Sequence, residues 1–319
     1  MKFIQQAYKG INEWWAYTVT IALWLIGWQF IGIVPMVGAA YYFSDGMDDF
    51  IRSTQDNFMS VGMDSNLFLL LMIVMSLGGL LGLFLGIKTI HKRKIITVLT
   101  SRNKIDWSRV FYSFSIWAVV GIVMTVISYF IAPEDYEWNF KPVSFLILVT
   151  ISFLFLPIQT TMEEILFRGY LMQGFGTWFK KGFIALIVTS AIFGLLHSAN
   201  PEVQKLGWIT MVYYIGTGLV MGIFTIMDEG TELALGFHAA NNIIAAILVT
   251  ADWVAFQTDA LLKDISEPSV GWEMFLPVFV LYPIMIWIFS KKYGWTNWKE
   301  KMFGTIKKPE VINESELKA

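Results

Sequence analysis

Long apolar runs alternate with short polar connections along the chain. Because a helix needs about 20 apolar residues to cross a hydrocarbon core of about 30 Å, we interpret each run as a membrane span. Eight runs occur, at 18–43, 66–88, 110–132, 143–175, 182–198, 206–227, 233–251 and 272–290. The fifth is short and the fourth is long. The pattern predicts an all-α integral membrane protein, a bundle of about eight transmembrane helices.

The connections between the runs differ in charge. Lys and Arg concentrate at 88–109 and after 290, whereas Asp and Glu dominate at 45–64, 134–137 and 252–267. Basic loops stay on the cytoplasmic side of a membrane. With an even number of spans, both termini are then cytoplasmic. We therefore expect a multi-pass protein of the cell membrane.

Composition supports a membrane protein. The chain is 56% hydrophobic and only 15% charged, whereas soluble domains are about a quarter charged. Mean hydropathy is +0.58. The net charge of −2 provides no basic surface for a nucleic acid. The lipid bilayer is the surrounding that the hydrophobic composition predicts. The absence of cysteine excludes thiolate metal sites and cysteine nucleophiles.

The connections leave no room for a soluble domain, so we expect 1–319 to be a single membrane domain. Residues 1–17 are interpreted as an interfacial segment with Trp14 and Trp15 at the headgroup level. The polar segment 307–319 is predicted to be a flexible cytoplasmic tail. Small-residue ridges in the second and sixth runs predict close helix packing, at Gly78, Gly82, Gly86, Gly218 and Gly222.

Ionisable side chains in the interior of the apolar runs indicate a candidate site, because they are expensive in lipid and usually functional. They concentrate in the fourth, fifth and seventh runs. Together with one amide they are Glu163, Glu164, Arg168, His197, His238 and Asn242. We expect these three helices to share one site. The third histidine, His91, lies in a basic connection, where a solvated side chain is expected.

Helical spacing separates two roles in the fourth run. Glu164 and Arg168 are four residues apart, which favours an ion pair on one helix face. Glu163 is rotated from Glu164 by about 100°, so we expect it to be free for chemistry. Counting from the turn near Phe179 places Glu163 and His197 at similar depth, with the site opening toward the cytoplasmic half. Asn241 is interpreted mainly as a packing residue.

Three short motifs have the order and the placement of a known family. EExxxR at Glu163–Arg168, FxxxH at Phe193–His197 and HxxxN at His238–Asn242 resemble the signatures of the CAAX protease and bacteriocin-processing family. These intramembrane proteases include the type II CAAX prenyl endopeptidases. The motif-bearing region covers 143–251. The resemblance implies an intramembrane catalytic cavity and hydrolysis of a peptide bond in a membrane-associated peptide or protein.

The resemblance also implies residue roles. Glu163 would be the catalytic carboxylate, and His197 would help it to activate water. His238 and Asn242 would stabilise the oxyanion of the tetrahedral intermediate. Structural support of the site would come from Glu164, Arg168 and Phe193.

Metal dependence has two interpretations. Glu163, His197 and His238 resemble a catalytic zinc set with an open position for water. The sequence contains no HExxH, however, and the same groups can act directly as a base and as oxyanion donors. We favour a reaction without an obligatory metal, with a divalent ion such as zinc as the alternative.

Two other classes of function remain open. A bacteriocin-immunity or regulatory membrane protein of the same fold would be non-catalytic. An ion-coupled transporter can also carry intramembrane Glu, Arg and His. Against a transporter, the sequence shows no paired inverted halves, and the polar groups gather in one place.

Overall fold

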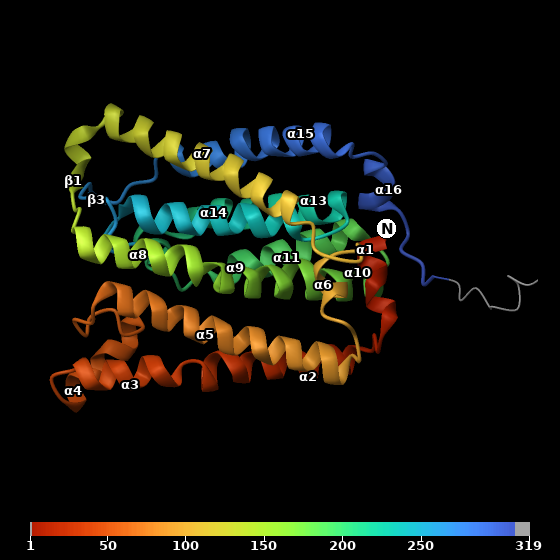
Figure 1. The fold of residues 1–319 in the computed structure, drawn as a ribbon, viewed down its shortest axis with the longest axis horizontal. Coiled ribbons are helices and arrows are strands. Elements are labelled where there is room, and N and C mark those ends of the chain that lie inside the picture. The colour runs from red at the N-terminus through yellow and green to blue at the C-terminus, as the bar shows by residue number, and fades with distance from the viewer. Residues whose placement is uncertain (1, 310–319) are drawn as a thin grey trace, which may run out of the picture.

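The computed structural model describes residues 2–309, which form an all-α bundle of long, roughly parallel helices (Figure 1). Six helical stretches in this part of the chain are long and apolar enough to cross a membrane, and two shorter apolar helices accompany them. These correspond to the eight predicted runs. Of the predicted tail, residues 310–319 lie outside the described part.

Of the first four stretches, all but the third contain more than one helical segment. Their bounds are α2 (Trp14–Leu25) and α3 (Val34–Phe43), joined by a π-helical segment (Ile26–Ile31); α5 (Ser65–Leu85) with a π-helical end (Gly86–Ile90); α7 (Trp107–Ile131); and α8 (Pro142–Leu154), α9 (Leu156–Glu164), a π-helical segment (Ile165–Leu171) and α10 (Met172–Phe179).

The second half of the chain follows with simpler helices. They are α11 (Gly182–Leu196), α13 (Met211–Asp228), α14 (Glu232–Leu248) and α15 (Tyr282–Tyr293), the last preceded by a π-helical segment (Pro277–Leu281). Short helices at the ends of the bundle are α1 (Lys2–Gln5), α4 (Met47–Ser53), α6 (Ile96–Leu99), α12 (Pro201–Leu206) and α16 (Trp298–Phe303). Single 3-10 turns occupy Gln6–Lys9, Thr54–Asp56, Pro133–Asp135, Trp208–Thr210 and Trp272–Met274.

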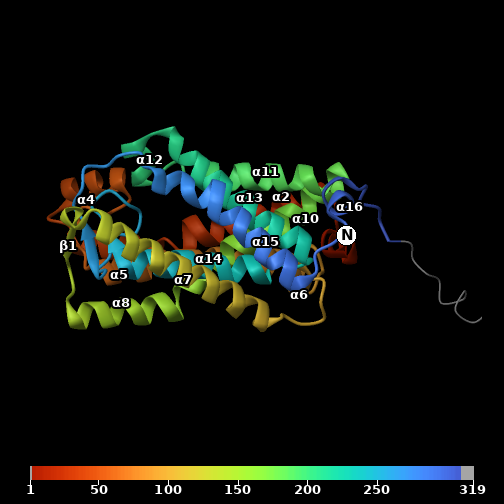
Figure 2. The same cartoon turned by 90° about the horizontal axis from the view of Figure 1, so that it is seen from above.

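A proline divides the long fourth stretch. Pro157 has no backbone N–H and cannot continue the ladder of the preceding helix. α8 therefore ends at Leu154, and α9 begins at Leu156 with Pro157 in its first turn. α8 lies along one edge of the bundle in Figure 2, whereas α9 carries the two glutamates inside it.

α14 is the central helix of the bundle. It contacts α7, α8, α9 and α13, and its residues from Glu232 to Ala240 are all buried. The outer helices instead expose large apolar side chains: Phe130 of α7 is 76% exposed and Phe279, before α15, is 66% exposed. Such a surface is stable in lipid and unfavourable in water. The protein is therefore a multi-pass membrane protein.

One end of the bundle carries a three-stranded sheet that the sequence did not predict. Its order is β1 (Tyr136–Trp138), β3 (Leu262–Asp264) and β2 (Val249–Thr250). β1 pairs antiparallel with β3, with Tyr136 opposite Asp264, and β2 pairs parallel with β3. Strands of two or three residues are too short to produce a period-two pattern.

The first and the last described residues both lie at the end of the bundle opposite the sheet (Figure 1). Phe3 and Ile4 are 1% and 0% exposed and pack with Ile306. Within the segment expected to be interfacial, these two side chains are thus covered by protein, whereas Trp14 is 69% exposed. The basic connection after α5 also lies here, since the Ile11 N–H donates to the carbonyl of His91 (2.9 Å).

The solvated position expected for His91 is wrong. The residue is 0% exposed. Its Nδ1 lies 2.6 Å from the carbonyl oxygen of Ile11, and its Nε2 lies 2.7 Å from the hydroxyl of Tyr170. The N-terminal segment folds back over the basic connection and buries the imidazole, a tertiary contact that local polarity does not reveal.

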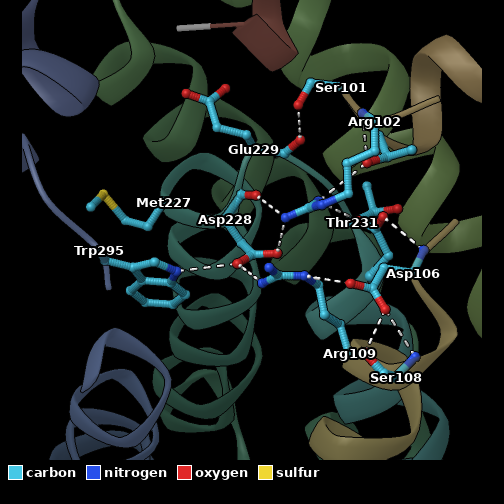
Figure 3. Close-up of polar contacts among 12 residues, drawn as sticks. Ser101, Arg102, Asp106, Ser108, Arg109, Met227, Asp228, Glu229, Thr231 and Trp295 are labelled. Atoms are coloured by element: carbon cyan, nitrogen blue, oxygen red, sulfur yellow. Dashed lines mark hydrogen bonds and ion pairs between the residues drawn. The ribbon is translucent and has the colours of Figure 1, made fainter. Parts of the chain in front are cut away.

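A buried polar cluster holds the turn between α13 and α14 (Figure 3). The carboxylate of Asp228 accepts hydrogen bonds from Arg102, Arg109 and the indole N–H of Trp295. Arg102 also bonds Glu232 (3.2 Å), the first residue of α14. The cluster ties the connection before α7 and the segment after α15 to the beginning of the central helix.

Candidate active site

One cavity of about 440 Å³ lies among α2, α5, α9, α11, α13 and α14. Its walls are mostly aromatic and aliphatic side chains. All four residues expected to carry chemistry line it, namely Glu163, His197, His238 and Asn242. The structure thus brings together side chains that span 79 positions of sequence, from Glu163 on α9 to Asn242 on α14. Phe193 lines the same cavity.

Glu164 is the polar centre beneath the cavity. Its Oε1 accepts hydrogen bonds from Nη1 of Arg168 (2.8 Å) and from Nδ1 of His238 (2.7 Å). Glu164 is 0% exposed and Arg168 is 1% exposed. The Glu164–Arg168 pair predicted from spacing is confirmed. Glu164 has a second partner that spacing did not predict, because it also fixes the imidazole of His238 on α14. Because these groups are buried, removing one of them would leave its partner without a compensating charge or hydrogen bond.

Arg168 links this centre to a third helix. Its guanidinium lies 4.2 Å from the ring centroid of Phe193 on α11, a cation–π contact that is stronger when desolvated. Phe193 also contacts both histidines. Its ring centroid lies 4.6 Å from that of His197 and 6.0 Å from that of His238. A phenylalanine at this position therefore connects the buried arginine with both imidazoles.

Glu163 is the least constrained carboxylate of the site. Its Oε1 accepts from the side-chain amide of Gln159 (3.0 Å), one turn earlier on α9. Its Oε2 has no hydrogen-bond partner among the described residues and lies 3.8 Å from Nε2 of His238. Because Glu163 lines the cavity, this buried carboxylate oxygen without a partner is a candidate proton acceptor.

His197 lies where α11 ends. Its Nδ1 is 2.7 Å from the carbonyl oxygen of Phe193. Because a carbonyl can only accept, Nδ1 carries the proton of the neutral ring, and Nε2 keeps its lone pair. Nε2 has no hydrogen bond to the described residues, and the ring lines the cavity. This orientation suits an acceptor for water.

Asn242 and Asn241 form a short amide chain on α14. Nδ2 of Asn241 donates to Oδ1 of Asn242 (3.2 Å), and Oδ1 of Asn241 accepts from the indole N–H of Trp117 (3.1 Å). This arrangement orients Asn242, which lines the cavity, and its Nδ2 group makes no hydrogen bond to the described residues. Asn241 therefore both packs between helices and orients a site residue.

The described side chains do not form a metal-binding group in this arrangement. No three His, Asp or Glu residues between positions 2 and 309 are close enough together to hold one ion. Nδ1 of His238 is engaged by Glu164, and Nδ1 of His197 by a backbone carbonyl, so only Nε2 of each ring could be a ligand. As placed, Glu163, His197 and His238 do not form a three-ligand group, and no metal is used in the mechanism proposed below.

The cavity extends toward the sheet end of the bundle. Val254, Ala255 and Phe256, from the connection after α14, line it, as does Leu69 near the beginning of α5. The acidic connections lie at this end, so the expected opening toward the half with the basic loops is not met. The reason is tertiary: the connection folds back on α14, with the hydroxyl of Thr258 donating to the carbonyl of Ala246 (2.6 Å).

Three further polar residues of the cavity wall were not predicted from the sequence. Asn200, Glu202 and Tyr214 line the cavity beside His197. Glu202 and Asn200 belong to a polar connection, and Tyr214 to an apolar helix, so none of them is unusual in its local context. Gln159 was also missed, although its position four residues before Glu163 is a signal that the sequence carries.

Comparison with known proteins agrees with this geometry. Residues 142–244 match the family model of the type II CAAX prenyl endopeptidase Rce1-like proteins. A Bacillus subtilis (strain 168) protein described as "Uncharacterized protein YyaK" is 28% identical over 289 residues, which are 89% of this chain and 95% of that protein. No solved structure matches the chain.

The matched segment runs from the beginning of α8 into α14. It contains all three signatures, EExxxR, FxxxH and HxxxN, and each of them contributes at least one polar side chain to one cavity inside an apolar helical bundle. Over residues 142–244, the chain is therefore similar to the type II CAAX prenyl endopeptidase Rce1-like proteins.

Proposed function

We propose that the protein is an intramembrane endopeptidase that hydrolyses a peptide bond in a membrane-associated peptide or protein, with Glu163 as the general base. The observation that carries the proposal is Oε2 of Glu163, which has no hydrogen-bond partner among the described residues, on a side chain that lines a cavity together with two imidazoles and an amide. A buried base, an oriented water and nearby donors are the requirements of peptide-bond hydrolysis without a covalent intermediate.

In the proposed reaction, a water molecule in the cavity donates one hydrogen bond to Glu163 and one to the lone pair of His197 Nε2. Glu163 removes a proton as the water oxygen attacks the carbonyl carbon of the substrate. The carbonyl oxygen becomes an oxyanion, toward which Asn242 Nδ2 donates, with His238 Nε2 as a second donor when it carries a proton. Glu163 then transfers its proton to the departing amine, and the C–N bond breaks.

Glu164 and Arg168 keep this arrangement in place. By holding Nδ1 of His238 (2.7 Å), Glu164 turns Nε2 toward Glu163. A catalytic group that shifts by about 1 Å can lose on the order of 100-fold in rate. The buried ion pair therefore acts through the position of His238 and makes no contact with the reacting atoms.

The test uses purified protein in detergent and a mixture of synthetic membrane peptides, with cleavage products identified by mass spectrometry. Glu163→Gln and His197→Ala should each reduce cleavage at least about 100-fold, the scale of general acid–base catalysis, while thermal unfolding of both variants stays cooperative. Glu134→Gln, at an exposed residue of a connection, is the matched control and should cleave like the wild type.

Wild-type cleavage that persists in Glu163→Gln would overturn the proposal. The non-catalytic alternative gives a different result in cells: an immunity or regulatory phenotype that Glu163→Gln retains. A protease role requires that cellular activity and peptide cleavage are lost together.

A further inference from the structure

His197 occupies a position that its own helix cannot hold rigidly. α11 ends at Leu196, and His197 is the residue after it, with φ −86° and ψ 0°. A side chain at a helix end lacks the following turn that restricts rotamers inside a helix. The bond from Nδ1 to the carbonyl of Phe193 fixes one atom of the ring but allows the imidazole to tilt about it.

A tyrosine from another helix covers the imidazole. The ring of Tyr214, on α13, lies 4.5 Å from that of His197 with an interplanar angle of 25°, which is a stacked arrangement. By comparison, Tyr214 meets its neighbour Tyr213 at 74°. Stacked aromatic pairs are stabilised beyond the area that they bury. The stacking therefore restricts the tilt that the single hydrogen bond leaves free.

The connection that follows His197 fixes the hydroxyl of Tyr214. This hydroxyl donates to Oε1 of Glu202 in α12. Nδ2 of Asn200 donates to both partners, at 3.0 Å to the Tyr214 hydroxyl and 3.2 Å to Oε1 of Glu202. Asn200 and Glu202 lie only three and five positions after the histidine, so the chain that leaves His197 returns to fix the residue stacked on it.

The geometry points to Tyr214, anchored by Glu202 and Asn200, as a positioning residue that holds His197 with Nε2 facing the cavity. None of these three residues belongs to the motifs that identified the site. The inference rests on the proposed function for its kinetic consequence, but its structural statement concerns His197 alone. Loss of the tyrosine ring should release the imidazole, and loss of its hydroxyl partner should loosen it.

The chain is well suited to a direct test because it contains only three histidines. Nitrogen-15 labelling of histidine in the full-length protein, reconstituted in detergent micelles, gives three imidazole spectra. The His197→Gln and His91→Gln spectra assign them by difference. In the wild type, His197 should show a protonated Nδ1 and a lone pair on Nε2, because Nδ1 donates to a carbonyl.

Tyr214→Leu should move the nitrogen signals of His197 toward the average of the two tautomers. In the peptide assay it should lower kcat about 10-fold with KM within about twofold, as expected for a misplaced catalytic group. Tyr214→Phe keeps the ring but loses its bond to Glu202, so the His197 signals should shift only part of the way, with kcat reduced less than about threefold. Tyr112→Leu, which removes a tyrosine packed against Phe289 and Tyr293 and not lining the cavity, controls for general destabilisation and should leave the His197 signals unchanged.

Unchanged His197 signals in Tyr214→Leu would overturn the inference. If that variant is not recovered folded, Glu202→Ala decides the question: it alters a connection residue and removes the partner of the Tyr214 hydroxyl, so wild-type signals in this variant would also overturn it. The two proposals fail separately. Cleavage by Glu163→Gln would remove the protease mechanism without affecting the spectra, whereas wild-type spectra in the Tyr214 and Glu202 variants would leave the role of Glu163 intact.

Discussion

At the residue scale, the site depends on how buried charges share partners. Glu164 serves Arg168 and His238 with a single oxygen, whereas its Oε2 has no partner among the described residues. Removing one partner of a buried ion pair leaves an uncompensated charge, which is far more costly than losing an exposed pair. Loss of the carboxylate should therefore lower the stability of the protein more for a buried ion pair than for an exposed one.

Glu164→Gln should lower the free energy of unfolding by about 3–5 kcal/mol, because Arg168 then stays buried without a counter-charge. The measurement is denaturant unfolding in mixed micelles. Asp49→Asn is the comparison: it breaks the exposed pair with Arg52, whose side chain is 75% exposed, and should cost no more than about 1 kcal/mol. Equal costs for the two variants would contradict the central role of Glu164.

His91 provides a pH-dependent contribution outside the membrane-spanning helices. Burial, with the nearby Arg93 as a smaller cause, lowers the pKa of His91 from its ordinary value of 6.5. The unfolded chain therefore binds the proton first as the pH falls. The stabilisation is fully present above about pH 6.5, the unfolded pKa, and is lost as the pH decreases through the lower folded pKa.

His91→Gln should flatten the stability profile below about pH 6.5, since glutamine does not titrate. Thermal unfolding of both proteins between neutral and acidic pH measures the effect. The wild type should lose more stability on acidification than the variant does. A variant with the same acid sensitivity as the wild type would show that other groups control it.

At the element scale, glycines determine how closely α5 approaches the first stretch. A Cβ placed on Gly78 would lie 2.2 Å from the carbonyl oxygen of Gly27, and one on Gly82 would lie 2.3 Å from that of Leu23. In the sixth run, a Cβ on Gly218 would lie 3.0 Å from Cα of Ser190. At these three glycines the predicted packing role is confirmed, because the contacts are with backbone atoms that cannot rotate away. At Gly86 and Gly222 the nearest atoms belong instead to the side chains of Thr20 and Leu186.

Gly78→Ala should destabilise the protein by about 1–3 kcal/mol, the cost of overpacking a tight contact. Gly38→Ala is the control within the same helix pair, because a Cβ there meets nothing within 4 Å; it should be neutral or stabilising by up to about 1 kcal/mol through helix propensity. Unfolding in mixed micelles compares the two. A cost for Gly38→Ala that matches Gly78→Ala would contradict the close approach.

The fourth stretch shows how element geometry serves the site. Pro157 interrupts the backbone hydrogen bonds that would continue α8, so α9 is a separate helix. A π-helical segment follows the two glutamates, at Ile165–Leu171. Such segments inside helices are rare and often accompany functional sites. Hydropathy predicted one long span here and could not predict either interruption of the regular ladder.

At the scale of the whole molecule, the two ends differ in charge and structure. The described N-terminal residues, the basic connection after α5 and α16 gather at one end, and the acidic connections with the small sheet form the other (Figure 1). Basic loops are retained in the cytoplasm. We therefore propose that both termini are cytoplasmic and that the cavity extends toward the outer side.

The absence of cysteine allows this orientation to be tested with single introduced thiols. In intact cells, a membrane-impermeant maleimide should label Ser269→Cys, in the exposed connection before α15, but not Lys104→Cys, in the exposed basic connection. After permeabilisation both should react. The reverse labelling pattern would invert the proposed orientation, while leaving the arrangement of the site unchanged.

Sequence alone determined the features that depend on local composition. Apolar length predicted the eight helices, because lipid requires about 20 apolar residues for each span. The cost of ionisable groups in lipid drew attention to Glu163, Glu164, Arg168, His197 and His238. Four-residue spacing predicted the Glu164–Arg168 pair, since such neighbours share a helix face.

Only the tertiary structure decided which groups share partners. It joined Glu164 to His238 across 74 positions, buried His91 beneath the N-terminal segment, and placed the loop residues 254–256 over the cavity. It also brought Tyr214 onto His197. These contacts depend on the relative positions of helices, which are set by packing over the whole bundle and leave no periodic signal in any one segment.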